Sequence, residues 1–192
     1  MPLGLAFSNG QEMVVGLDQG PNGNTAKARF ELLHNRTVIS IVGDRSAIEG
    51  LIFDSHLDSL GEHEHTTTVA HYIHAKLTIK IIPNIASYVG HTEIMIAGIE
   101  PLRHVTAPKI YYLDSKSNFD LVTLDAGAAL AGDKLVAQKL ITDRDIAHLD
   151  KAGLTTLAKE CFTASRLRWP SVIGAHLKLA YLAPHDIKVY DL

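Results

Sequence analysis

Several classes of protein are excluded by what this sequence has little of. Its 192 residues include one cysteine, Cys161, so no disulfide can form within the chain, and a reducing compartment such as the cytoplasm is expected. No stretch approaches the roughly 18 apolar residues that a membrane-spanning helix needs. The net charge is only −3, which provides no strong positive field. We therefore expect no membrane and no nucleic-acid partner.

Low-complexity segments, internal repeats and the basic-then-apolar start of a signal peptide are also missing. Hydrophobic residues make up 46% of the chain and charged residues 20%, which excludes a disordered protein because enough apolar surface exists to form a core. This length suits one domain, and we predict a single domain over residues 1–192. Composition indicates a globular, cytoplasmic protein but names no function.

The hydrophobic pattern predicts strands that come in groups. Asn9-Gly10 lies between two apolar runs and is a strong hairpin signal, because both residues tolerate positive φ. β-branched residues support the other strands. The predicted strands are Leu3–Phe7, Met13–Asp18, Arg29–Leu33, Thr37–Val42, Glu93–Ile99, Lys109–Leu113, Leu121–Leu124, Leu177–Leu182 and Ile187–Asp191.

Four helices are predicted in two pairs. Ser46 and Glu49 match a capping box, in which a hydroxyl and a carboxylate accept hydrogen bonds from amides at the helix start. Threonines begin the second helix, and Trp169-Pro170 ends the fourth. The predicted helices are Ser46–Gly61, Thr66–Ile81, Ala129–Ile141 and Ala152–Arg168.

Grouped strands favour mostly antiparallel sheets, because a doubly wound parallel sheet needs a helix between successive strands. We predict an α+β fold, a four-layer αββα sandwich. Two mostly antiparallel sheets would face each other, with a pair of helices on each outer face. Alternation of apolar residues predicts the buried positions of the strands, among them Ile39, Ile41, Ile94, Ile96, Leu177 and Leu179.

This order of elements, over the whole chain, resembles that of the proteasome-type N-terminal-nucleophile hydrolases. The stretch Arg29–Asp44 resembles the basic–aromatic strand, apolar strand and small-residue turn of that family. Ile94–Ile99 resembles the strand after its second helix, and Ile110–Asp114 resembles the next hairpin. Ala126–Ala129 lies where the family has a glycine-rich turn into its third helix.

The resemblance implies a catalytic machinery that can be compared with this sequence. In the family, a Thr, Ser or Cys at the start of the mature chain is the nucleophile, and its own α-amine helps as a base. Aligning Gly4 with the family's early glycine places Met1 or Pro2 near the nucleophile position. Neither side chain can attack a carbonyl, so we expect no threonine-peptidase activity.

The supporting residues of that machinery match in part. Asp18 falls where the family has the Asp that positions a catalytic lysine, but the lysine position itself falls on Ala28 or Arg29. Ser171 matches a later family Ser, whereas Arg168 stands where an Asp is expected. By resemblance, the candidate catalytic residues are therefore Asp18, Arg29 and Ser171.

Histidine is abundant, with eleven in the chain. His63 and His65 alternate with glutamates, and His71 and His74 follow at a spacing that shares one helix face. Imidazole with carboxylate suits Zn, Ni or Fe, although a solvated polar turn explains the same residues. These four histidines are candidate metal ligands, and no cofactor is predicted.

Three functions remain open. The leading hypothesis is a non-catalytic, proteasome-like subunit that acts as a structural or binding protein and self-associates into a ring or other homo-oligomer. Family resemblance implies assembly through the helix layers, where apolar residues such as Leu57 and Tyr72 are expected on outer faces. The alternatives are an amide or peptide hydrolase of the same fold with a displaced nucleophile, and a His-rich metal-binding module.

Overall fold

The computed structural model describes residues 1–20, 28–34, 36–44, 46–54, 56–57, 59–60, 65–80, 90–101, 106–124, 126–184 and 186–192. Its strands are β1 (Leu3–Ser8), β2 (Met13–Asp18), β3 (Ala28–Leu33), β4 (Thr37–Gly43), β5 (Thr92–Pro101), β6 (Thr106–Asp114), β7 (Val122–Leu124), β8 (Gly127–Gly132), β9 (Leu177–Ala183) and β10 (Asp186–Asp191). Its helices are α1 (Ser46–Ile52), α3 (Thr66–Lys80), α4 (Leu135–Ile141) and α5 (Lys151–Arg168), with short 3-10 turns at Ser115–Ser117 and Ile146–His148.

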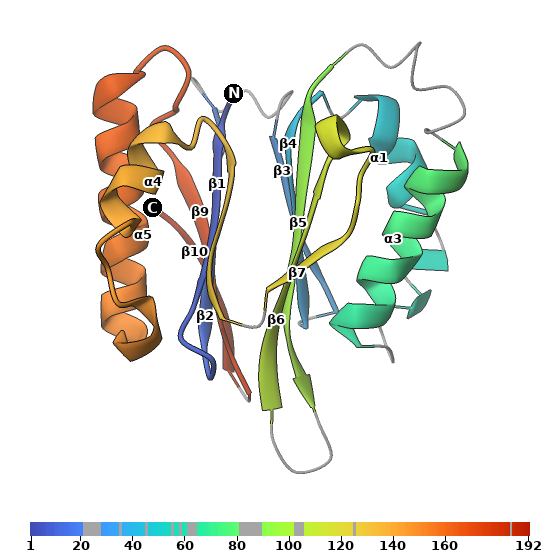
Figure 1. Ribbon diagram of the computed structural model, residues 1–192, viewed down its shortest axis with the longest axis horizontal. Helices are drawn as coiled ribbons and strands as arrows, with labels where there is room; N and C mark the ends of the chain where they lie inside the picture. The colour runs from blue at the N-terminus through green and yellow to red at the C-terminus, as the bar shows by residue number, and fades with distance from the viewer. Residues whose placement is uncertain are drawn as a thin grey trace.

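Two antiparallel five-stranded sheets face each other, and helices cover both outer faces (Figure 1). One sheet has the strand order β10-β9-β2-β1-β8 and is covered by α4 and α5; the other has the order β3-β4-β5-β6-β7 and is covered by α1 and α3. This confirms the predicted four-layer αββα sandwich.

Three apolar layers hold these elements together. The layer between the sheets consists mostly of Ala, Val, Leu and Met side chains, including Ala6, Val15 and Met95. The two outer layers join each sheet to its helices and contain the larger Leu, Ile and Phe side chains. The six strand residues predicted to be buried, Ile39, Ile41, Ile94, Ile96, Leu177 and Leu179, are all buried.

The predicted third helix is wrong over its first part. Residues from Gly127 to Gly132 form strand β8, which pairs with the whole of β1, and the helix α4 begins only at Leu135. Alanine favours helices, but Ala129 and Ala131 lie in the layer between the sheets, where small side chains fit and the ladder to β1 satisfies the backbone.

The first helix is shorter than predicted, because α1 ends at Ile52. The carboxylate of Asp54 then accepts a hydrogen bond from the amide of Leu57 at 2.9 Å, which begins a separate helical turn; the predicted end, Gly61, lies outside the described residues. Leu57 is fully buried, so the expectation that it lies on an outer face is wrong, whereas Tyr72 is partly buried against the same core. None of the helices described is long and apolar enough to cross a membrane.

A matched pair of substitutions tests the outer layer over sheet β3–β7. Ile96→Ala, at a fully buried position, should lower the free energy of unfolding by about 2–5 kcal/mol, because it removes apolar contacts and leaves a cavity. Ile79→Ala, on the exposed face of α3, should change it by no more than about 0.5 kcal/mol. Urea unfolding measures both, and equal effects would contradict the assigned layers.

Candidate functional site

Asp18, the last residue of β2, is a buried carboxylate held by backbone amides. Its Oδ1 accepts hydrogen bonds from the amides of Gly20 at 2.9 Å and Gly174 at 2.8 Å. Its Oδ2 is also buried, near the amide of Leu3, without a well-formed hydrogen bond to a described residue. Gly174 lies so close to the carbonyl of Gly20 that a side chain there would collide with it. Asp18 therefore ties the end of β2 to the turn before β9.

Burial raises the pKa of Asp18 above its ordinary value, and this effect outweighs the amides of Gly20, Gly174 and Leu3 and the charge of the N-terminal amine, which all lower it. No Lys or Arg side chain pairs with this carboxylate within the described ranges. The interactions of Asp18 are thus those of a residue that fixes backbone geometry.

The two candidates for the lysine position point to opposite faces of β3. Ala28 lies in the layer between the sheets. Arg29 points to the helix side, where its guanidinium contacts the carboxylates of Glu49 and Glu31 and lies 3.8 Å from the ring centroid of Phe53. An open hollow of about 450 Å³ beside Arg29 is also lined by residues flanking Asp18, but not by Asp18 itself. The structure therefore does not bring the Arg29 charge onto the Asp18 carboxylate.

Ser171 lies exposed in the turn that follows α5. It precedes Gly174, which contacts Asp18, but no hydrogen bond from its own hydroxyl to another described side chain is present. A serine without an adjacent base is a weak nucleophile. The turn that contains Ser171 also contains Gly174, which binds Asp18, but no contact joins any two of the three candidates among the described residues.

The three predicted histidines that the structure describes do not form a metal-ligating cluster. His65 and His71 are exposed on or next to α3, His74 is half-buried, and His63 lies outside the described residues. The ring of His71 packs 6.5 Å from that of Tyr111. Within the described part of the chain, the metal-ligating side chains that converge are His91, Glu93 and Asp114 instead.

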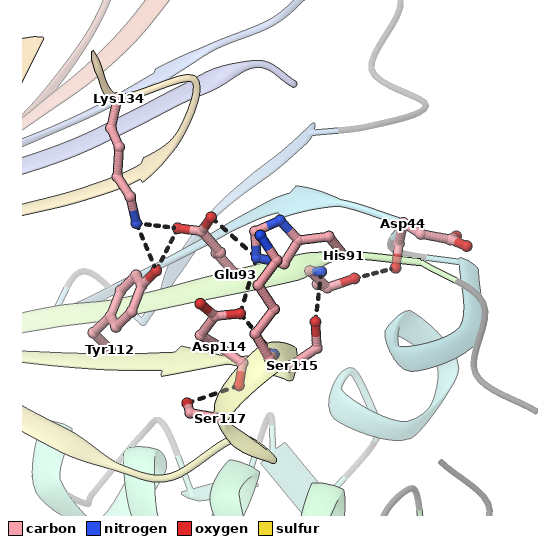
Figure 2. A network of polar contacts seen from close by, with 10 residues as sticks. Asp44, His91, Glu93, Tyr112, Asp114, Ser115, Ser117 and Lys134 are labelled. Carbon is pink, nitrogen blue, oxygen red and sulfur yellow. Dashed lines mark hydrogen bonds and ion pairs between the residues drawn. The ribbon is translucent and has the colours of Figure 1, made fainter. Parts of the chain in front are cut away.

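Those three residues form the centre of a polar network at the edge of the central layer (Figure 2). Nε2 of His91 lies 2.9 Å from Oδ1 of Asp114 and 3.3 Å from Oε1 of Glu93. Glu93 is on β5 opposite Asp114 on β6, and its side chain is only 1% exposed. Glu93 lies on the same face of β5 as Met95 and Ala97, so it points into the space between the sheets.

Tyr112 and Lys134 complete the network on the other oxygen of Glu93. The Tyr112 hydroxyl donates to Oε2, and Nζ of Lys134 lies 3.4 Å from the same oxygen and 3.3 Å from the hydroxyl. Lys134 comes from the segment between β8 and α4, so it reaches across from the opposite sheet (Figure 2). Burial, followed by the Glu93 carboxylate, raises the pKa of Tyr112, which keeps the phenol protonated and able to donate.

None of the sequence-predicted site residues belongs to this network, although the sequence contains a signal for it. Glu93 begins one predicted strand, His91 stands two residues before it, and Asp114 follows the end of the next predicted strand. In two successive antiparallel strands the start of the first lies beside the end of the second. The predicted histidine set lies between residues 63 and 74 instead, where histidine is locally dense.

The fold and these positions can be compared with known proteins. No family model matches the sequence, and no curated protein matches it. The structure of Anbu from Hyphomicrobium sp. strain MC1 matches with a TM-score of 0.69 and 12% identity, covering 98% of this chain and 86% of that one. Its Gly-1 mutant matches with a TM-score of 0.69 and 13% identity, covering 100% and 87%.

Anbu is a bacterial protein of the proteasome-like N-terminal-nucleophile hydrolase fold. This chain has the same fold. At 12–13% identity the likeness concerns architecture, and the side chains of each site must be judged on their own geometry.

The buried Asp18 has a consequence for stability as a function of pH. Because its folded pKa is raised, its contribution to stability is present below the unfolded pKa and is lost as pH rises through the folded pKa. Asp18→Asn keeps a carbonyl acceptor and removes the titration. We expect the free energy of unfolding of the variant, relative to the wild type, to increase as the pH rises above the ordinary Asp pKa of 3.8.

Urea unfolding at several pH values measures this difference. Asp120→Asn, which removes an exposed carboxylate, controls for the change in net charge. A variant whose relative stability worsens with rising pH would show that the wild-type carboxylate is stabilised as an anion.

Proposed function

We propose that this protein is a non-catalytic, proteasome-like subunit that self-associates as a structural or binding protein. The observation that carries this proposal is the bonding of Asp18. In the resembled enzymes a carboxylate at this strand end positions a lysine, whereas here backbone amides of Gly20 and Gly174 occupy Oδ1. Ala28, one of the two residues at the lysine position, has no charge, and Arg29 is engaged on the helix side of β3.

The nucleophile position supports the same function. The residues before Gly4 are Met1, Pro2 and Leu3, and none has a hydroxyl or thiol. Ser8 lies at the opposite end of β1, where it is buried and its hydroxyl accepts from the amide of Gly10. Acyl transfer would need a nucleophile from another part of the chain.

The outer face of α4 and α5 offers a surface for self-association. Leu140, Ala164 and Leu167 line a shallow hollow of about 520 Å³, and Leu167 is 79% exposed. On its rim, Arg144 and Glu160 pair at 3.2 Å, so both signs of charge are present. Apolar residues rimmed by both charges suit contact between copies of one chain, and closed symmetry would leave no open ends.

Light scattering coupled to size-exclusion chromatography tests the assembly. We expect the wild type to be larger than a dimer at micromolar concentration. Leu167→Glu should lower the mass without lowering Tm appreciably, because the residue makes few contacts within the chain. Val122→Glu, at an exposed position on the edge strand β7, is the matched control and should retain the wild-type mass. A monomeric wild type would contradict the proposal.

A panel of short fluorogenic peptides, together with a covalent inhibitor of N-terminal nucleophiles, tests the absence of catalysis. We expect turnover no faster than the buffer background and no adduct in the intact mass, because losing the nucleophile commonly costs several orders of magnitude in rate. The same mass identifies the first residue of the mature chain. Turnover that is abolished by the inhibitor, with an adduct on Ser171 lost in Ser171→Ala, would favour the hydrolase alternative.

A further inference from the structure

One nitrogen and two carboxylate oxygens converge at the end of the sandwich where β5 begins. Nε2 of His91 faces Oδ1 of Asp114 at 2.9 Å and Oε1 of Glu93 at 3.3 Å, and the three atoms all lie within 4.8 Å of one another. An imidazole nitrogen and carboxylate oxygens are both common ligands of divalent metal ions, and here they face one another.

We propose that His91, Glu93 and Asp114 bind a divalent transition-metal ion through Nε2, Oε1 and Oδ1. The donor set of one imidazole and two carboxylates suits Zn²⁺ or Mn²⁺. This site is distinct from the histidine set suggested by the sequence, and it does not depend on the proposed function.

The separations agree with coordination by one ion. Metal–ligand bonds of about 2.1 Å place neighbouring ligand atoms about 3.0 Å apart at a right angle and about 3.4 Å apart at a tetrahedral angle. The distances from Nε2 of His91 to the two oxygens, 2.9 and 3.3 Å, fall at these values. The third pair, Oε1 of Glu93 and Oδ1 of Asp114, lies within 4.8 Å, and side-chain rotation must set this separation when an ion binds.

Neighbouring side chains orient Glu93 as a ligand. Tyr112 and Lys134 both engage its Oε2, which leaves Oε1 directed at His91. Hydrogen bonds of this kind fix a coordinating carboxylate and are usual around metal sites. Tyr112 and Lys134 are positioning residues here, since they act through Glu93.

Burial is graded across the three ligands. The Glu93 side chain is almost completely buried, whereas those of His91 and Asp114 are 24% and 20% exposed. Glu93 therefore forms the floor of the site and the other two its open side, through which an ion can enter. Three protein ligands leave at least one coordination position for water, as in metal sites that bind a further ligand.

Titration calorimetry on the chelator-treated full chain, with Zn²⁺ or Mn²⁺ alone, tests the site. We expect one ion per chain, and we expect Asp114→Asn and His91→Ala each to raise Kd at least ~100-fold. Tyr112→Phe keeps all three ligands and should raise Kd about tenfold. The double variant His63→Ala/His65→Ala is the control and should bind as the wild type does.

A second measurement needs no variant. In the wild-type chain, substoichiometric Mn²⁺ should broaden the NMR signals of the His91 ring before those of His71. Unchanged Kd in Asp114→Asn, earlier broadening of His71, or the absence of saturable binding would each overturn the proposal. Loss of binding in the His63/His65 control, with His91→Ala unaffected, would assign the ion to the histidine-rich segment instead.

Discussion

The structure depends on one constraint, which is that the central strands are buried on both faces. The whole of β1, β2 and β4 is buried, because one face of each strand meets the opposite sheet and the other meets a helix pair. Such strands must be apolar at nearly every position. Polar side chains that are buried therefore concentrate at strand ends, and Asp18 and Glu93 both obey this rule.

These two carboxylates lie at the same end of the sandwich, and their buried oxygens have different hydrogen-bond partners. Gly4 of β1 pairs with Leu17, the residue before Asp18. Across the central layer, Gly4 is close to Val42 and Met95 of the other sheet, and Val42 is the partner of Glu93. Asp18 is bound by backbone amides, which lock a turn. Glu93 is bound by Tyr112 of β6 and by Lys134 from the opposite sheet, which leaves a carboxylate oxygen directed at His91. Only the second arrangement brings an imidazole nitrogen and two carboxylates together.

Much of the fold could be predicted from residues whose local pattern agrees with their final surroundings. Ile39, Ile41, Ile94 and Ile96 alternate in β-branched runs, and both propensity and packing place them in strands. Strand β8 was missed because its alanines favour a helix locally, and only pairing with β1 makes them a strand. The overall resemblance was visible in the order of elements, because that order survives when individual residues change.

The site was less predictable because its residues meet through strand register. Glu93 faces Asp114 only because β5 and β6 pair in one particular register, and a shift of one residue would turn Glu93 toward the helices. Lys134 joins them from the other sheet, at a distance that no local pattern encodes. The histidines between residues 63 and 74 are close together in the sequence, but among the described residues the side chains that come together in space are His91, Glu93 and Asp114.

The two sheets differ in how the chain supplies them. All strands of β3–β7 come from one continuous stretch, whereas the other sheet joins β1 and β2 to β8, β9 and β10 from the far end of the sequence. More than a hundred residues separate Asp18 of β2 from its partner Leu177 of β9. At typical rates of synthesis, the apolar β1–β2 hairpin waits roughly 10 to 30 s for its neighbours. During that interval the completed β3–β7 half can shield one face of the hairpin, and the face later covered by α5 remains open to aggregation or to a chaperone.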